Sequence, residues 1–170
     1  AWFVKAFPFG GYQTLPFAPA WYAAAAREPA PAGTPVTTPV PPMPDFPAEI
    51  FAGDWRCLCR TQKKCPTAQL AARQDAGNPA WLVRYTAQRL QRLAEREALP
   101  ASQAWTEGEQ ALLLLAAAFA QRQQRDTPAQ LFRYLTELAR QVWRERCFEG
   151  GAAQRCARVL AAGYERLSQP

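Results

Sequence analysis

From residue 66 to residue 170, hydrophobic side chains recur every three or four positions, the spacing that gathers them on one face of an α-helix. Residues that start or stop helices divide this region into five segments, which begin at Pro66, at Asn78-Pro79, at Thr106, at Thr127-Pro128 and after Gly150-Gly151. The first segment is short and ends near Asp75, and the second runs to about Ala98. The sequence therefore predicts an all-α fold, a small bundle of four to five helices.

Two of these segments predict how the bundle packs. The segment that begins at Thr106 matches a capping box with Glu109 and contains the apolar run Ala111 to Ala120. Because this helix is apolar on nearly every side, we expect it at the centre of the bundle. In the next segment, a repeat at four-three-four spacing predicts a packing seam rather than a cofactor site. Its members are Leu131, Leu135, Leu138 and Val142.

Residues 1–47 follow no helical or strand period. They hold most of the sixteen prolines, interleaved with aromatic side chains that have no partners within the segment. We therefore expect a long extended Pro- and aromatic-rich N-terminal arm whose aromatic side chains anchor it in grooves on another subunit. The expected partner-binding residues are Trp2, Phe3, Phe7, Phe9, Phe17, Trp21 and Tyr22. The alternative is that these side chains fold back over the helical body.

Residues 48–65 connect the arm (1–47) to the helical bundle (66–170). Asp45 can cap a short helix through Ile50 and Phe51, which Gly53 would end. The letters WRCLCRTQKKCP then predict a compact basic loop. Its basic group could bind phosphates, or it could lie in a solvated or interface-facing loop. The group consists of Arg56, Arg60, Lys63 and Lys64, with Trp55 beside it.

The five cysteines fall into two groups. An antiparallel helix pair around Gly150-Gly151 would bring Cys147 and Cys156 together, so we expect a disulfide there and an oxidising compartment. The alternative is two small buried thiols. Cys57, Cys59 and Cys65 could hold zinc with a fourth ligand, could form one disulfide from Cys65, or could stay unpaired. Because their spacing lacks the Cys-x2-Cys pairs of zinc ribbons and fingers, we expect no metal.

Composition narrows the chemistry further. The net charge is +6 with a pI near 9.4, and Arg supplies most of the positive charge. A GC-rich genome explains this bias better than selection for a polyanion, so we expect protein partners rather than nucleic acid. The chain has no histidine, which excludes Ser-His-Asp and Cys-His nucleophile systems. Its acidic residues are scattered among arginines. We therefore expect no catalytic activity and no cofactor.

Residues 1–26 predict neither a signal peptide nor a spanning helix, because prolines and glycines interrupt the apolar stretch. They could contact a membrane surface. The run Ala111 to Ala120 is about half the length that crosses a bilayer. The first residue, Ala1, is expected where an initiator Met or a targeting peptide has been removed.

Together these features predict a non-catalytic accessory subunit whose arm staples neighbouring subunits of a large membrane-associated complex. A mitochondrial energy-transducing complex at the inner membrane is the favoured assembly. One alternative is an exported bacterial envelope component in the periplasm, such as part of a secretion or conjugation apparatus. Another is an RNA-associated protein of an organellar ribosome, which rests on the pI alone.

Overall fold

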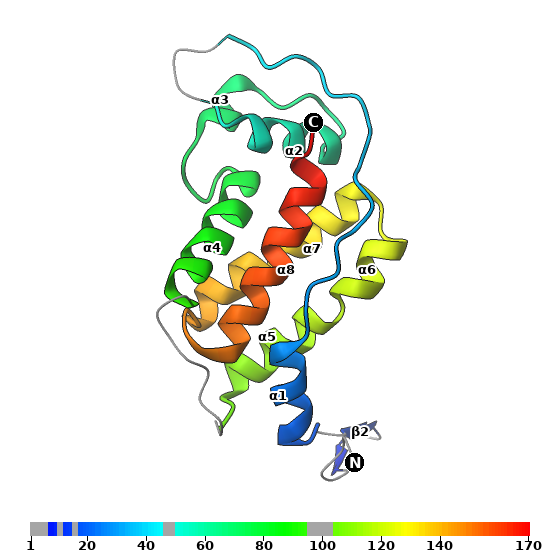
Figure 1. Cartoon of the computed structure of the whole chain (residues 1–170), viewed down its shortest axis with the longest axis vertical. Helices are drawn as coiled ribbons and strands as arrows, with labels where there is room; N and C mark the ends of the chain where they lie inside the picture. The colour runs from blue at the N-terminus through cyan, green and yellow to red at the C-terminus, as the bar shows by residue number, and fades with distance from the viewer. Residues whose placement is uncertain (1–6, 10–11, 15–16, 46–49, 95–103) are drawn as a thin grey trace.

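The computed structural model describes residues 7–9, 12–14, 17–45, 50–94 and 104–170 (Figure 1). Apart from one short antiparallel hairpin, the regular secondary structure of these residues is helical, which confirms the predicted all-α fold. The hairpin pairs β1 (Phe7–Phe9) with β2 (Tyr12–Thr14). The helices are α1 (Pro19–Arg27), α2 (Ala52–Thr61), α3 (Ala68–Ala72), α4 (Pro79–Ala94), α5 (Glu107–Ala117), α6 (Phe119–Arg125), α7 (Pro128–Glu145) and α8 (Gly150–Ser168). None of the helices in the described ranges is both long and apolar enough to span a bilayer.

Helix α8 lies at the centre of the bundle and contacts α1, α2, α4, α5 and α7 (Figure 1). The prediction that the apolar helix α5 holds this place was wrong. Leu112 and Leu113 of α5 are buried, but Leu114 is 43% exposed. Helix α8 carries small residues such as Ala153 and Ala157 on its buried faces, so several helices can approach it closely.

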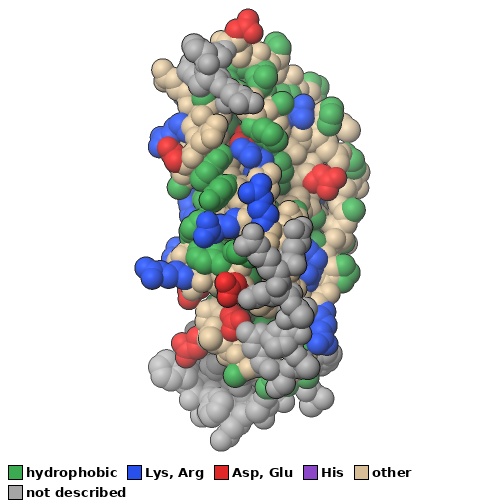
Figure 2. Space-filling view, turned by 60° about the vertical axis from the view of Figure 1, so that its left-hand side comes forward, with side chains coloured by type: hydrophobic (Ala, Val, Ile, Leu, Met, Phe, Trp, Pro, Cys, Tyr) green, Lys and Arg blue, Asp and Glu red, His purple; other side chains and the backbone are tan. Residues whose placement is uncertain are grey.

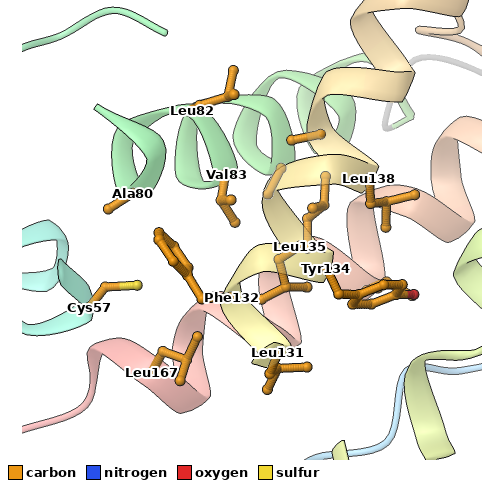
Figure 3. Packing of buried hydrophobic residues seen from close by; sticks show 14 of the residues in the cluster. Cys57, Ala80, Leu82, Val83, Leu131, Phe132, Tyr134, Leu135, Leu138 and Leu167 are labelled. Atoms are coloured by element: carbon orange, nitrogen blue, oxygen red, sulfur yellow. The ribbon is translucent and has the colours of Figure 1, made fainter. Parts of the chain in front are cut away.

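The packing seam predicted on α7 is confirmed. Leu131, Leu135, Leu138 and Val142 are each at most 1% exposed. In Figure 3, Phe132 of the same helix lies among Ala80 of α4, Cys57 of α2 and Leu167 of α8, so four helices share one core. This core determines how α4 and α7 are placed side by side.

Start signals in the sequence locate three helices correctly. Thr106 and Glu109 form a capping box at the start of α5, and Thr127 and Gln130 form another at α7. The side chain of Asn78 accepts hydrogen bonds from the first turn of α4. The helix predicted after Thr106 is nonetheless interrupted at Ala118, which separates α5 from α6. With this break and with α1 and α2, the chain has more helices than the four to five predicted.

The segment before residue 66 differs most from its prediction. Helix α2 begins at Ala52 and continues to Thr61, so Gly53 does not end a helix and the basic stretch is not a loop. Gly53 lies in the first turn of α2. Glycine is needed at this position because a Cβ there would be 2.5 Å from Oη of Tyr164. Trp55 and Leu58, three positions apart, are buried against the bundle. Tertiary packing of this face therefore outweighs the helix-stopping tendency of glycine.

Residues 17–45 of the arm fold back over the body, as the alternative interpretation expects for the arm. Residues 19–27 form α1, which packs on α5 and α8, and residues 28–45 then run extended along the bundle (Figure 1). Val36 in this extended part is buried, and its N–H donates to the carbonyl oxygen of Arg166 at 3.5 Å. Residues 17–45 are thus part of the same folded unit as α8.

Three arginines of α8, which we call the arginine clasp (Arg155, Arg158 and Arg166), hold this arm by its backbone. Arg155 donates to the carbonyl oxygen of Glu28 at 2.6 Å and to the Glu28 carboxylate at 3.0 Å. Arg158 donates to the carbonyl oxygen of Ala26. Arg166 donates to the carbonyl oxygen of Thr34 at 2.8 Å. Part of the arginine content of the chain thus supplies donors to carbonyl oxygens at the end of α1 and, through Arg166, to the extended segment that follows it.

Helices α7 and α8 pack closely at Gly163, and replacing this glycine with alanine is expected to destabilise the fold by about 1–3 kcal/mol. An added Cβ would lie 2.5 Å from Cδ1 and 2.6 Å from Cδ2 of Leu135, which is itself fully buried. Urea unfolding would measure the loss. Gly108→Ala is the matched control. The three atoms nearest to its Cβ would all belong to the exposed, flexible Glu145 side chain, so stability should stay within about 1 kcal/mol of the wild type. Equal effects at both positions would contradict the close crossing.

Candidate functional site

Four partly exposed aromatic rings form a continuous series along α4, α7 and the α7–α8 turn. We call this series, Trp81, Tyr85, Trp143 and Phe148, the aromatic strip. Trp81 and Tyr85 stack with ring centroids 4.5 Å apart and an angle of 8° between planes. Tyr85 and Trp143 are 6.2 Å apart at 11°, and Phe148 meets Trp143 edge to face at 5.0 Å. Three nearly parallel rings from two helices thus share one surface.

The strip is held rigidly from behind. The indole Nε1 of Trp143 donates to Oγ1 of Thr86, at 2.9 Å, and Thr86 is only 1% exposed. Val83 and Val142, which are fully buried, lie in the core beneath the strip. Because the rings are fixed before any partner arrives, binding to them would cost little side-chain entropy.

Positive charge lies beside the rings. The guanidinium of Arg89 is 5.3 Å from the ring centroid of Trp143 and 5.1 Å from that of Phe148. In Figure 2, where the α4 side of Figure 1 faces the viewer, hydrophobic side chains gather in a strip with Lys and Arg beside them. A half-exposed aromatic surface flanked by arginine resembles the centre of protein-binding interfaces in composition. The ring faces can bind a partner, but they carry no nucleophile or general base.

A buried polar network lies at the junction of α2, α4 and α8. The Asp54 carboxylate accepts hydrogen bonds from Nε and Nη2 of Arg84, each at 2.9 Å, and from Oη of Tyr164 at 2.7 Å. Burial, together with the negative charge of Asp54, raises the pKa of Tyr164. The Arg84 guanidinium also lies 4.1 Å from the ring centroid of Phe51. Since every polar partner in this network is another residue of the chain, its role is to join three helices.

The predicted partner-binding residues fall into three groups. Trp2 and Phe3 lie outside the described residues, and Phe7 and Phe9 are placed only through the backbone of β1. Phe17 and Trp21 stack at 4.3 Å at the start of α1. Tyr22 is 6% exposed and packs with Leu113, Ala152 and Trp105 of its own chain, which corrects its assignment as an anchor on another subunit. Burying this ring stabilises the docking of α1.

All five cysteines are free thiols, so the expected Cys147–Cys156 disulfide is absent and the argument for an oxidising compartment loses its basis. Cys147 precedes the first turn of α8, whereas Cys156 is six residues into that helix, about 9 Å along the axis. Disulfides rarely join Cα atoms more than about 7 Å apart. Burial raises the pKa of Cys156 and of Cys57, and it raises the pKa of Cys147 to about 11. These thiols are poor nucleophiles at neutral pH.

The other cysteines lie on or just after α2. Cys57 faces the core, Cys59 is half-buried, and Cys65 is exposed. Burial, followed by the nearby Cys65, raises the pKa of Cys59 to about 11. In the described ranges, no three Cys, Asp or Glu side chains are grouped as a metal site would require. The absence of a metal or cofactor stays a prediction, since it concerns the whole chain.

The basic group splits into two parts. Arg56 and Arg60 lie one turn apart on α2, where they donate to carbonyl oxygens of the arm and of the end of α8. Lys63 and Lys64 follow α2 and are exposed.

The sequence alone indicates half of the aromatic strip. Trp81 and Tyr85 are one turn apart, so sequence reasoning places them on one face of α4. It misses Trp143 and Phe148, which only the packing of α7 beside α4 brings to the strip.

Comparisons with protein-family models, with curated proteins and with solved structures find no match to this chain.

Proposed function

We propose that the chain is a non-catalytic accessory subunit that binds another protein of a larger assembly through the aromatic strip. The observation that carries the proposal is the strip itself, in which four rings in mutual contact stay partly exposed although the core beneath them is complete. Exposed apolar surface of this kind is a liability in a monomer unless a partner covers it. The favoured assembly is a membrane-associated one, a mitochondrial energy-transducing complex, with a bacterial envelope apparatus as the alternative.

A shorter part of the arm than residues 1–47 is now proposed to contact a neighbouring subunit. Residues 17–45 lie on the chain's own α5 and α8, so they would hold the arm in place rather than bind a neighbour. Residues 1–16 then constitute the part that would reach another subunit. Trp2, Phe3, Phe7 and Phe9 belong to this stretch, and they remain the proposed stapling residues.

The test removes two partly exposed rings of the strip. In the Trp81→Ser, Tyr85→Ser double variant, we expect the affinity for the natural partner to fall by at least about 30-fold, because the loss of even one central aromatic residue of an interface costs about 2 kcal/mol or more. The partner is first identified by cross-linking and mass spectrometry in the native source. Its affinity for the purified chain is then measured by titration calorimetry.

Leu114→Ser is the matched control, because Leu114 is 43% exposed on α5, away from the strip. This variant should bind the partner as the wild type does. Equal loss of affinity in both variants, or full retention in the double variant, would contradict the assignment of the strip as the docking surface. Recovery of RNA in place of protein would contradict the proposed class of partner.

A further inference from the structure

The arm passes the C-terminal end of α8 on its way to α2 (Figure 1). A pocket of about 370 Å³ lies between the arm and α2. It has two unlike walls, one from the extended arm and one from α2. Thr38, Val40 and Met43 line the first, and Trp55, Arg56 and Arg60 line the second. The pocket thus combines apolar surface with two cationic groups, and its volume falls within the range of small-molecule sites.

Both guanidinium groups are held in place by backbone carbonyl oxygens. Nε of Arg56 donates to Ser168 at 2.6 Å. Arg60 donates through Nε to Thr38 at 3.2 Å and through Nη1 to Leu167 and Gln169 at 3.1 and 2.6 Å. Within the described residues, these bonds use only part of each donor set. They leave both Nη groups of Arg56 and Nη2 of Arg60 to bind a ligand.

No Asp or Glu side chain among the described residues pairs with these two positive charges, those of Arg56 and Arg60. Burial, and next the charge of Arg56, lower the pKa of Arg60. Both side chains donate to carbonyl oxygens at the end of α8, where the partial negative charge of the helix compensates part of their charge. An anion bound between the two guanidinium groups would relieve their repulsion.

The remaining walls suit an apolar group. Trp55 is 4% exposed, and its Nε1 donates to the carbonyl oxygen of Pro41 at 3.0 Å, so the indole is fixed between α2 and the arm. Met43 is 46% exposed at the mouth of the pocket. A ligand that carried charge alone would leave this apolar surface uncovered, and an uncharged ligand would leave the guanidinium groups unpaired.

We propose that this pocket binds a small amphipathic oxyanion, a carboxylate or a phosphate monoester with a short apolar tail. The charged group lies on Arg56 and Arg60, and the tail contacts Val40, Met43 and Trp55. Because one wall is the arm, the ligand also joins the arm to α2. This site lies apart from the aromatic strip, so it does not depend on the proposed docking function.

The test uses the full chain and n-hexyl phosphate as the probe, followed by ¹H–¹⁵N NMR. We expect the indole resonance of Trp55 and the Nε resonances of Arg56 and Arg60 to shift and to saturate below about 10 mM, an ordinary affinity for a small site. Arg56→Gln should weaken binding by about tenfold, the effect of losing one charge-assisted hydrogen bond. Arg140→Gln, the same change at an exposed position of α7, should leave binding unchanged.

Met43→Trp is a second variant for the case that Arg56→Gln perturbs the fold. It keeps both arginines but fills the mouth of the pocket, so it should also weaken binding. Inorganic phosphate and n-hexanol should each bind at least about tenfold more weakly than hexyl phosphate. Equal binding of inorganic phosphate would show a bare anion site, and equal binding of hexanol would show an apolar site. Either result, or no saturable shift at the three resonances, would overturn the proposal.

Discussion

Replacing Asp54 with alanine is expected to lower the free energy of unfolding by about 3–5 kcal/mol, the usual result of removing one partner of a buried ion pair. The Asp54 side chain is 2% exposed and that of Arg84 is 17% exposed. Alanine would remove the acceptor of both Arg84 hydrogen bonds and of the Tyr164 hydroxyl. The guanidinium would then stay largely buried without a counter-charge. Urea unfolding followed by circular dichroism at neutral pH would measure the loss.

Glu137→Ala is the matched control. Glu137 pairs with Arg144 at 3.7 Å on the surface, where both side chains are at least half exposed. Exposed pairs of this kind contribute at most about 1 kcal/mol. A similar loss in both variants would mean that Asp54 acts through general charge balance rather than through the junction of α2, α4 and α8.

Replacing Arg155 with methionine is expected to release the arm and to accelerate elastase cleavage after Val36 by at least about tenfold. Arg155 is fully buried and makes two hydrogen bonds to Glu28, one of them to its carboxylate. Hydrogen bonds to charged groups contribute about 1.5–3 kcal/mol each. When local opening is fast, the cleavage rate follows the population of the open state. Intact-mass spectrometry of timed digests would measure it.

Arg140→Met, an exposed change on α7, serves as the control and should be cleaved at the wild-type rate. Arg166→Met is a second clasp variant at a half-buried position, and it should release the arm with less risk to the core. Unchanged cleavage in both clasp variants would contradict the clasp. Rapid cleavage of the wild type after Val36 would instead favour an arm that is free to bind other subunits.

The sequence predicts those parts of the fold whose signals are local. The caps at Asn78, Thr106 and Thr127 and the seam on α7 depend on neighbouring residues, and each is found where the letters place it. Helix α2 was missed because Gly53 is a stop signal by propensity, whereas Tyr164, distant in sequence, leaves room for no other residue there. The position of α8 at the centre likewise depends on contacts that no single segment encodes.

The candidate site likewise combines features that local sequence signals predict with features that depend on distant contacts. Trp81 and Tyr85 are one turn apart, so the sequence places them on one face, but their continuation into Trp143 requires the crossing of two helices. The retention of the arm is harder to predict. Arginine side chains bind carbonyl oxygens of the arm, and every residue type carries such an oxygen. The amino-acid sequence of the arm therefore does not predict these backbone contacts.

A segment held through its main chain is constrained in length and backbone shape but hardly in side-chain identity. Among the residues 28–35 that pass the clasp, most side chains point to solvent, and the carbonyl oxygens make the contacts. Two positions are exceptions, because the Glu28 carboxylate also binds Arg155 and a Cβ at Gly33 would lie 2.7 Å from Cδ of Arg166. At the other positions of this stretch, substitutions should accumulate freely during evolution as long as the backbone stays extended. The clasp residues, three and then eight positions apart on one side of α8, should drift far more slowly. Relatives of this chain would then be recognised by arginine spacing in the last helix rather than by similarity in the arm.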